Sequence, residues 1–494
     1  MAPKIRNHRL KTHETKRALP SRQASTHAQG LSVNCKLGIR SCEQTRLGKL
    51  VHAASKGSLA LKCQDRCGRL LVAMRSFAAG DVILLETPLC TCPIPGVVAH
   101  PSICVSLAKL GNKVSKDEER RKLVEELFDG GDRPSMFDNY CSKAKDMTAS
   151  FDENWMRRFF RIFGLNCFSW QGAGSALFLV GSLFNHSCHP NAVYQSGMHE
   201  GLFRATRPIE VGDEVTVTYS ASVWELTSRR QQYLTDNYLF ACLCDLCMAP
   251  EHFRSTRCPR RGCSGFAVPS PSGQSWHCAT CGSTHAQDAM PTGAESWLET
   301  LALDHKVNQH AYPRHSFIAA LKLSARTLGP KHWSVNLLAD MLLDSACESA
   351  SHGSGAAQQV MDLTRMQLAF AKQVAPHIKT RGSVYVNRML QSVLALRGAG
   401  WRRQAANLSA EILGDYRTIY GNDDEDASSL EEWARDATDT FGKEFFWERW
   451  EDEIGDLCFS AKDQAGVEST FQALRHALRD RPQKSNQSAA MSFV

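Results

Sequence analysis

The spacing of the cysteines constrains this chain more than any other feature of its sequence. The chain has 19 cysteines, and seven of them fall into two groups with close, regular spacing. They are Cys242, Cys244 and Cys247, followed by Cys258, Cys263, Cys278 and Cys281. Because no hydrophobic secretory segment opens the sequence, we expect such groups to bind metal rather than to form disulfides. The second group has the paired spacing of a zinc ribbon, whereas the first offers three thiolates to a tetrahedral zinc and is one ligand short.

The charge of the chain is concentrated at one end. The net charge is +7, and residues 1–30 hold seven Lys or Arg side chains against one acid, Glu14, which gives +6 for that segment alone. We interpret residues 1–62 as a disordered basic arm that is either a targeting signal or a solvated tail. The near-neutral remainder argues against nucleic acid as a direct ligand. The longest apolar run, residues 175–184, is shorter than the roughly 20 residues of a membrane helix, so no membrane association is expected.

The pattern of apolar residues predicts several regions in the 494 residues. Short strand-like runs at 70–73 and 82–85 are joined by a Gly-Asp turn, and such runs return over 176–219. Between them, residues 96–163 show helical spacing and predict a helical insertion. Residues 291–482 contain helix–Gly–helix units, which fit either an array resembling tetratricopeptide repeats or an irregular helical bundle, and residues 483–494 form a tail.

Two further motifs point to a family. Residues 185–191 read Asn-His-Ser-Cys-His-Pro-Asn, and residues 212–219 read Gly-Asp-Glu-Val-Thr-Val-Thr-Tyr. Together with the cysteine trio, they resemble the SET domain of the SET-and-MYND branch (SMYD-like), here without a MYND finger. The resemblance implies an α+β multidomain protein with a β-rich SET core at 63–250 and a post-SET segment at 223–250. A zinc ribbon at 251–290 and the helical C-terminal domain would follow.

The resemblance also implies an activity, namely transfer of a methyl group from S-adenosylmethionine to the ε-amine of a protein lysine. Neutral lysine is needed, and an aromatic channel favours it by desolvation. Tyr219 would be the catalytic residue. The cofactor would contact Gly68, Arg69, Asn185, His186 and Phe240, and the lysine channel would be formed by Phe168, Tyr219 and Tyr238. Cys188 would complete the first zinc site with Cys242, Cys244 and Cys247, so that two Zn²⁺ ions are expected with the ribbon cysteines.

Other implied properties concern partners and location. We expect a monomer in the nucleus or cytoplasm whose partner is a lysine-bearing protein, a histone or another.

One position departs from the family pattern. Leu70 stands where the family has the second glycine of Gly-x-Gly, and a leucine would be costly there if the backbone required a positive φ. This favours an alternative hypothesis, a SET-derived zinc protein that binds partners without methylating them. A zinc protein that binds nucleic acid is a further alternative, against which the charge balance argues.

Four cysteines near the N-terminus have loose spacing. Cys35, Cys42, Cys63 and Cys67 fit either a metal site or free and buried thiols.

Overall fold

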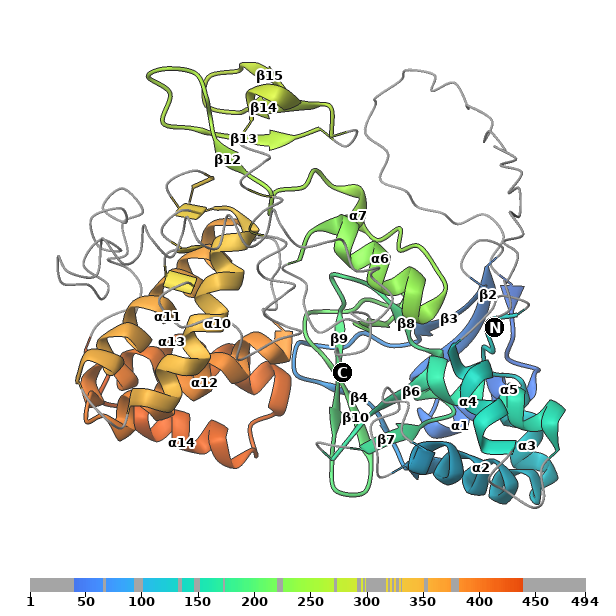
Figure 1. The fold of residues 1–494 in the computed structure, drawn as a ribbon. Helices are drawn as coiled ribbons and strands as arrows, with labels where there is room; N and C mark the ends of the chain where they lie inside the picture. Colours follow the sequence, from blue (N-terminus) through green and yellow to red (C-terminus); the bar gives the residue numbers. More distant parts are fainter. Residues whose placement is uncertain are drawn as a thin grey trace, which may run out of the picture. The chain divides into compact units, whose positions relative to one another are not determined.

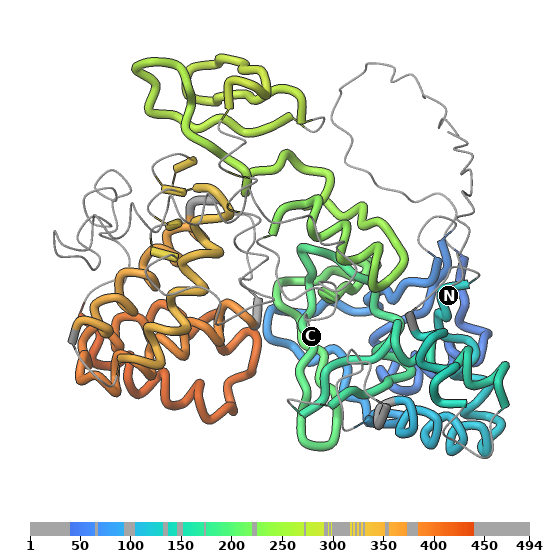
Figure 2. The backbone as a smooth tube through the Cα atoms, viewed as in Figure 1, coloured from blue at the N-terminus to red at the C-terminus, as the bar shows by residue number. Residues whose placement is uncertain are grey.

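The computed structural model describes residues 40–64, 68–92, 101–131, 136–145, 152–171, 174–219, 225–270, 273–290, 331–350, 354–374 and 382–438, with isolated residues between 295 and 329. Figure 1 shows these elements, and Figure 2 follows the backbone by colour from the N-terminus to the C-terminus.

The folded part of the chain begins earlier than the predicted boundary at residue 63. A strand β1 (Arg40–Ser41), a helix α1 (Arg46–Ala54) and a strand β2 (Leu59–Gln64) precede or cross it. Leu47, Val51 and Leu59 from these elements are buried in the core, which explains why the segment is ordered. The predicted arm can therefore extend only over residues 1–39, which lie outside the described residues.

The strands between residues 40 and 217 form four small sheets. Three of them have three strands each, and the fourth is a short parallel pair. In order they are β1-β2-β3 (β3, Gly68–Ala73), β4-β10-β9 (Val82–Glu86, Gly201–Ala205, Ala192–Ser196), β5-β7-β6 (Cys90–Cys92, Gly174–Leu177, Cys167–Trp170) and β11-β8 (Thr216–Val217, Asn185–His186). The predicted Gly-Asp turn is present, since Gly80 has φ +92° and its N–H donates to the carbonyl of Ala205.

The predicted insertion is helical. It contains α2 (Pro101–Ser115), α3 (Glu118–Glu125), α4 (Met136–Lys145) and α5 (Glu153–Asn166). Asp117 and Asp152 cap α3 and α5 by accepting backbone N–H bonds. One face of α5 is apolar and buries Phe159, Phe160 and Phe163, so this helix anchors the insertion in the core.

The cysteine-rich part contains two short helices followed by a four-stranded antiparallel sheet. The helices are α6 (Thr227–Tyr238) and α7 (Asp245–Met248), and the strands are β12 (Thr256–Arg257), β13 (Phe266–Pro269), β14 (Ser275–Cys278) and β15 (Thr284–Ala286). Trp276 is fully buried in the small core of this sheet, beside Cys258 and Cys278. With so few apolar residues, this core depends on its cysteines for stability.

The described C-terminal part is helical, as predicted. It contains α10 (Trp333–Ser349), α11 (Ser354–Val374), α12 (Gly382–Gly398), α13 (Arg402–Tyr420) and α14 (Glu425–Ala434). These helices share one apolar core, in which Leu342, Val360 and Leu408 are among the buried residues. Repeat character stays a prediction, and residues 439–494 lie outside the described residues. None of the described helices is both long and apolar enough to cross a membrane.

Candidate active site and metal centres

A partly buried carboxylate positions the segment that carries Asn185 and His186. Glu86, the last residue of β4, accepts hydrogen bonds from the backbone N–H groups of Leu179, Val180 and Gly181 at 2.8, 2.9 and 2.7 Å. Burial raises the pKa of Glu86, and these three bonds act in the opposite direction. They fix the turn that enters the 3₁₀ helix η1 (Gly181–Leu183) and then β8.

The two sequence motifs are brought side by side by a parallel strand pair. Asn185 pairs with Thr216, and His186 pairs with Val217. Asn191 braces this pair, because its Oδ1 accepts from the Thr216 N–H at 2.8 Å and its Nδ2 donates to the Glu214 carbonyl at 2.9 Å. The motifs at 185–191 and 212–219 therefore form one structural unit.

His186 connects the cysteine group to Tyr219. Its Nδ1 accepts a hydrogen bond from the Tyr219 N–H at 2.9 Å, and its Nε2 lies 3.1 Å from the Cys188 sulfur. Since Nδ1 is the acceptor, the proton of the neutral ring is on Nε2, which donates to the sulfur. Burial lowers the pKa of His186 to about 4, which keeps the ring neutral at physiological pH.

Tyr219 lies in an aromatic cluster. Its ring centroid is 4.9 Å from that of Tyr238 and 6.2 Å from that of Phe240, the latter edge-on. Its hydroxyl donates to the Phe184 carbonyl at 2.6 Å. Burial raises the pKa of Tyr219, so the phenol keeps its proton at neutral pH. The structure thus brings together Tyr219, Tyr238, Phe240 and His186, four of the residues predicted for the site.

The sulfurs of Cys188, Cys242, Cys244 and Cys247 all lie within 4.8 Å of one another, and those of Cys188 and Cys247 are 3.5 Å apart. A tetrahedral zinc with Zn–S bonds of about 2.3 Å requires sulfurs roughly 3.8 Å apart. The predicted fourth member, Cys188, is therefore placed where such a site needs it, and this donor set could hold Zn²⁺.

A buried arginine lies beside this cysteine group. Arg230 is 1% exposed, and its Nη2 is 3.8 Å from the Cys247 sulfur. Burial acts against its charged form, but the sulfurs of Cys188 and Cys247 raise the pKa of Arg230 above its ordinary value. A cation at this place offsets the negative charge of four thiolates. No sequence pattern distinguishes Arg230 from Arg229 beside it, so Arg230 was not predicted to lie here.

The second cysteine group also fits zinc. The distance between the sulfurs of Cys258 and Cys281 is 3.7 Å, and that between Cys263 and Cys278 is 3.8 Å. All four lie within 4.8 Å of one another. His285 was not predicted to take part, yet its Nε2 lies 3.3 Å from the Cys258 sulfur. Each cysteine group therefore has a histidine in contact with one sulfur.

The start of β3 contacts Asn185 through the backbone of Arg69. Gly68 has φ +69°, a conformation that favours glycine, and the Arg69 carbonyl accepts from Asn185 Nδ2 at 2.8 Å. Leu70 is not among the described residues with positive φ, and its buried side chain packs against Ala60 and Val72. The strain considered for Leu70 is therefore absent, because this position lies within a regular strand.

Phe168 has a different set of ring neighbours. It packs against Phe178, Tyr194 and Phe203, with centroid distances of 5.7, 4.6 and 5.6 Å. Its place in a lysine channel stays a prediction.

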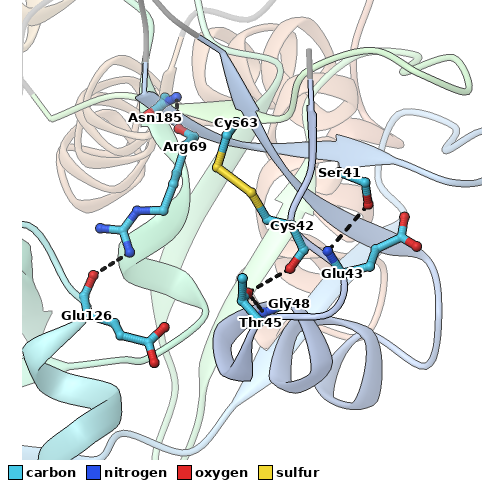
Figure 3. The surroundings of a disulfide bond; sticks show 9 residues. All are labelled: Ser41, Cys42, Glu43, Thr45, Gly48, Cys63, Arg69, Glu126 and Asn185. Atoms are coloured by element: carbon cyan, nitrogen blue, oxygen red, sulfur yellow. Dashed lines mark hydrogen bonds between the residues drawn. A yellow bond between two sulfur atoms is a disulfide. The ribbon is translucent and has the colours of Figure 1, made fainter.

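Two of the loosely spaced cysteines form a disulfide, which neither interpretation of the sequence included. Cys42 and Cys63 are bonded, with Cα atoms 6.4 Å apart (Figure 3). The pairing of β1 with β2 places Arg40 opposite Cys63 and so brings the two thiols together. Figure 3 also shows Arg69, which lies opposite Cys63 in the next strand pair, with its hydrogen bond to Asn185. Cys35 and Cys67 lie outside the described residues.

Comparison with known proteins supports the resemblance. Residues 68–220 match the family model of the SET domain. A SET and MYND domain-containing protein of Dictyostelium discoideum is 32% identical over 118 residues, which are 21% of this chain and 34% of that protein. Human histone-lysine N-methyltransferase SMYD3 is 33% identical over 151 residues, or 28% of this chain and 32% of SMYD3. Histone-lysine N-methyltransferase ASHR1 of Arabidopsis thaliana is 32% identical over 120 residues, or 22% of this chain and 24% of ASHR1.

The similarity is confined to part of each protein. The matched segments span about a third or less of the length of these relatives. Among solved structures, the SET domain of LSMT bound to lysine and AdoHcy aligns over 88% of this chain and 95% of that chain. It does so with 10% identity and a TM-score of 0.28, which is too low to support an inference.

Proposed function

We propose, from the premise that residues 68–220 are a SET domain with SMYD relatives, that this chain is an S-adenosylmethionine-dependent protein-lysine N-methyltransferase. Its substrate would be a lysine of a histone or another protein, because SMYD3 and ASHR1 are named histone-lysine N-methyltransferases.

The observation that carries this proposal is the contact between the cysteine-rich tail and the SET motifs. Cys188 lies in the first motif and Cys242, Cys244 and Cys247 lie in the tail, and their sulfurs converge. The residues just before the trio, Tyr238 and Phe240, consequently pack against Tyr219. A protein with two structural zinc sites and no reaction would not require this aromatic enclosure around a partly buried tyrosine.

The chemistry needs a neutral lysine amine. Free lysine titrates near 10.4, and an enclosure of aromatic rings disfavours its charged form by removing water. The Tyr219 hydroxyl donates its proton to the Phe184 carbonyl. Toward a substrate, its oxygen can therefore only accept a hydrogen bond. It would orient an amine N–H and thereby direct the nitrogen lone pair.

S-adenosylmethionine, when bound, supplies a methyl group on a sulfonium. Attack by the amine forms an N–C bond while the S–C bond breaks, and the nitrogen then loses one proton to water. In this scheme the chain contributes alignment and desolvation rather than a strong base. Its zinc ions would hold Tyr238 and Phe240 in place and take no part in the bond changes.

The alternative of an inactive SET-derived protein depended on Leu70. Because Leu70 packs in a strand with an ordinary φ, that feature no longer favours the alternative. Titration with S-adenosylmethionine separates the two hypotheses, since an inactive protein of this kind would show no saturable binding.

The test is transfer of a radiolabelled methyl group to histones and to a cell extract. We expect Tyr219→Phe to lower kcat by about 100-fold or more, because it removes an oriented polar group from a dry site, and to leave the zinc content unchanged. Tyr420→Phe is the matched control, since it removes a hydroxyl that bonds Asn387 in the helical part. Undiminished transfer by Tyr219→Phe would contradict the assigned role.

A further inference from the structure

Cys63, one half of the disulfide, lies between two arginines in the sheet β1-β2-β3. It is directly opposite Arg40 of β1 and directly opposite Arg69 of β3 (Figure 3 shows Cys63 and Arg69). Residues that lie directly opposite in antiparallel strands have their side chains on the same face of the sheet. An arginine from each neighbouring strand therefore flanks the Cys63 sulfur.

These arginines act on the reduced form of the pair. A positive charge near a thiol stabilises its thiolate, which is the nucleophile in disulfide exchange. The same stabilisation favours the reduced state and makes the disulfide easier to reduce. Two carboxylates lie nearby, but Glu126 interacts with Arg69 itself, and Glu43 is exposed, where solvent screens its charge. The local charge therefore favours a Cys63 thiolate.

The other described thiols have different surroundings. Eight of them form the two cysteine groups that fit zinc. Burial raises the pKa of Cys141 and of Cys347 to about 11, so these thiols keep their protons at neutral pH. Cys42 and Cys63 belong to neither kind, because both are only half-buried and both lie outside the zinc groups. This pair combines solvent access with a cationic environment.

The compartment expected for this chain also bears on the disulfide. The resemblance predicts the nucleus or cytoplasm, where glutathione keeps most thiols reduced. A disulfide in such a compartment is usually transient and catalytic or redox-sensing. A permanent structural disulfide would be unusual there.

We propose that Cys42 and Cys63 form a reversible redox site whose co-reactant is a small disulfide of the glutathione class. The Cys63 thiolate attacks one sulfur of glutathione disulfide, so that a new S–S bond forms, the old one breaks and a glutathione thiolate leaves. The Cys42 thiolate then attacks the Cys63 sulfur and releases the second glutathione. The two cysteines lose two electrons and two protons, and the two glutathione thiols gain them. This inference is independent of the proposed function.

The redox state would act on the beginning of α1. The Cys42 N–H donates to the Leu61 carbonyl at 3.1 Å, and the Cys42 carbonyl accepts from the Thr45 hydroxyl at 2.6 Å. Thr45 in turn caps α1 by accepting from the Gly48 N–H at 3.0 Å. The disulfide fastens this capped turn to β2. Without it, the turn is held mainly by the two-residue strand β1, so amide exchange at Cys42 and Gly48 should become faster on reduction.

The test uses the full zinc-loaded chain, reduced with a phosphine that is then removed. The chain is placed in glutathione buffers that range from reduced to oxidised. Peptide mapping by mass spectrometry gives the fraction of the Cys42–Cys63 disulfide at each ratio, and a chromophoric chelator reports free zinc. We expect the fraction to change across this range while both zinc ions stay bound.

Variants of the flanking arginines test the cause. Arg40→Gln should lower the rate constant of oxidation at pH 7 by about 2- to 5-fold, and its disulfide should persist in a buffer about 2- to 5-fold more reducing. Arg40→Lys keeps the charge and should restore both values. Arg69→Gln should act in the same direction as Arg40→Gln. Arg75→Gln is the matched control, because Arg75 is an exposed arginine six residues after Arg69 that pairs with Asp81.

Each alternative gives a different result. A Cys42–Cys63 bond that stays fully oxidised in every buffer would be a permanent structural disulfide and would overturn the proposal. Zinc release before the disulfide forms would place the reactive thiols in the cysteine groups, and a bond from Cys63 to Cys35 or Cys67 would refute the assigned partner. Equal effects of Arg40→Gln and Arg75→Gln would refute activation by the flanking charge. Methyl transfer is measured separately, so its loss would count against the proposed function alone.

Discussion

Replacement of His186 by phenylalanine should weaken one zinc site and leave the other intact. Phenylalanine keeps a ring of similar size but loses both nitrogens. The Nε2 contact with the Cys188 sulfur at 3.1 Å and the bond from the Tyr219 N–H at 2.9 Å disappear together. Outer-shell partners of this kind contribute about 10- to 100-fold to metal affinity, which corresponds to about 1.4 to 2.7 kcal/mol.

The measurement is a zinc competition titration with a chromophoric chelator. The unmutated chain should release two zinc ions. In His186→Phe, the chelator concentration that releases one of them should fall by about 10- to 100-fold. The ribbon site, Cys258 to Cys281, is an internal reference in the same molecule. His285→Phe gives the reciprocal experiment, because His285 contacts Cys258 at 3.3 Å.

The reasoning is refuted if both ions of His186→Phe are released as in the unmutated chain. It is also refuted if both sites weaken together, because the histidine would then support the fold in general rather than its own cysteine group.

Three further predictions concern stability, measured as the free energy of unfolding in urea. Glu86→Gln turns an amide NH₂ toward at least one of three backbone N–H groups and should cost about 1–3 kcal/mol, whereas no loss would mean that the turn at Leu179–Gly181 holds without it. For Glu295, burial acts to raise the pKa, but hydrogen bonds from His332 and Arg254 outweigh it and lower the pKa to about 2 from an ordinary 4.5. A carboxyl group with a depressed pKa stabilises the fold above pH 4.5, and this contribution is lost as the pH falls toward 2. Glu295→Gln should therefore lower the free energy of unfolding by about 3 kcal/mol at pH 7 and by progressively less below pH 4.5. A difference between the two proteins that does not change with pH would contradict this. The Cys42–Cys63 disulfide, with a sequence separation of 21, should contribute about 3 kcal/mol to the free energy of unfolding. The double serine variant should therefore be less stable than the oxidised chain by this amount and as stable as the chain reduced with a phosphine in the presence of zinc, because a dithiol reductant would also remove zinc from the cysteine groups.

The cysteine spacing predicted the donor sets because thiol ligands of zinc lie close in sequence as well as in space. The trio at 242–247 and the four ribbon cysteines needed no knowledge of the fold. Cys188 lies 54 residues before Cys242. It could be predicted as a ligand only through the resemblance to SET domains, since no other cysteine lies near it with zinc-like spacing. The same resemblance grouped Tyr219 with Tyr238 in one channel, and their rings are in contact. It assigned Phe240 to the cofactor and did not predict the contact of Phe240 with Tyr219.

The supporting hydrogen bonds could not be predicted, because they join polar side chains to backbone atoms far away in sequence. Glu86 lies 93 positions from Leu179, and Asn185 lies 116 positions from Arg69. No periodicity or spacing encodes such pairs. The disulfide was missed for a related reason: it depends on the register of a two-residue strand, β1, in a segment that the sequence analysis assigned to a disordered arm.

The parallel pairing of β8 with β11 has a consequence for how the molecule is made. Parallel neighbours cannot be joined by a tight hairpin and need a long connection. Residues 187–215 form this connection, and they must fold back before β8 can pair with β11. Contacts of long sequence separation form slowly, and the tail that carries Cys242 to Cys247 arrives later still from the ribosome. A nascent or truncated chain that stops before Cys247 would therefore contain the small sheets and insertion helices that precede it and yet have no enclosed tyrosine, so that ligand binding rather than the secondary structure of this region reports its maturation.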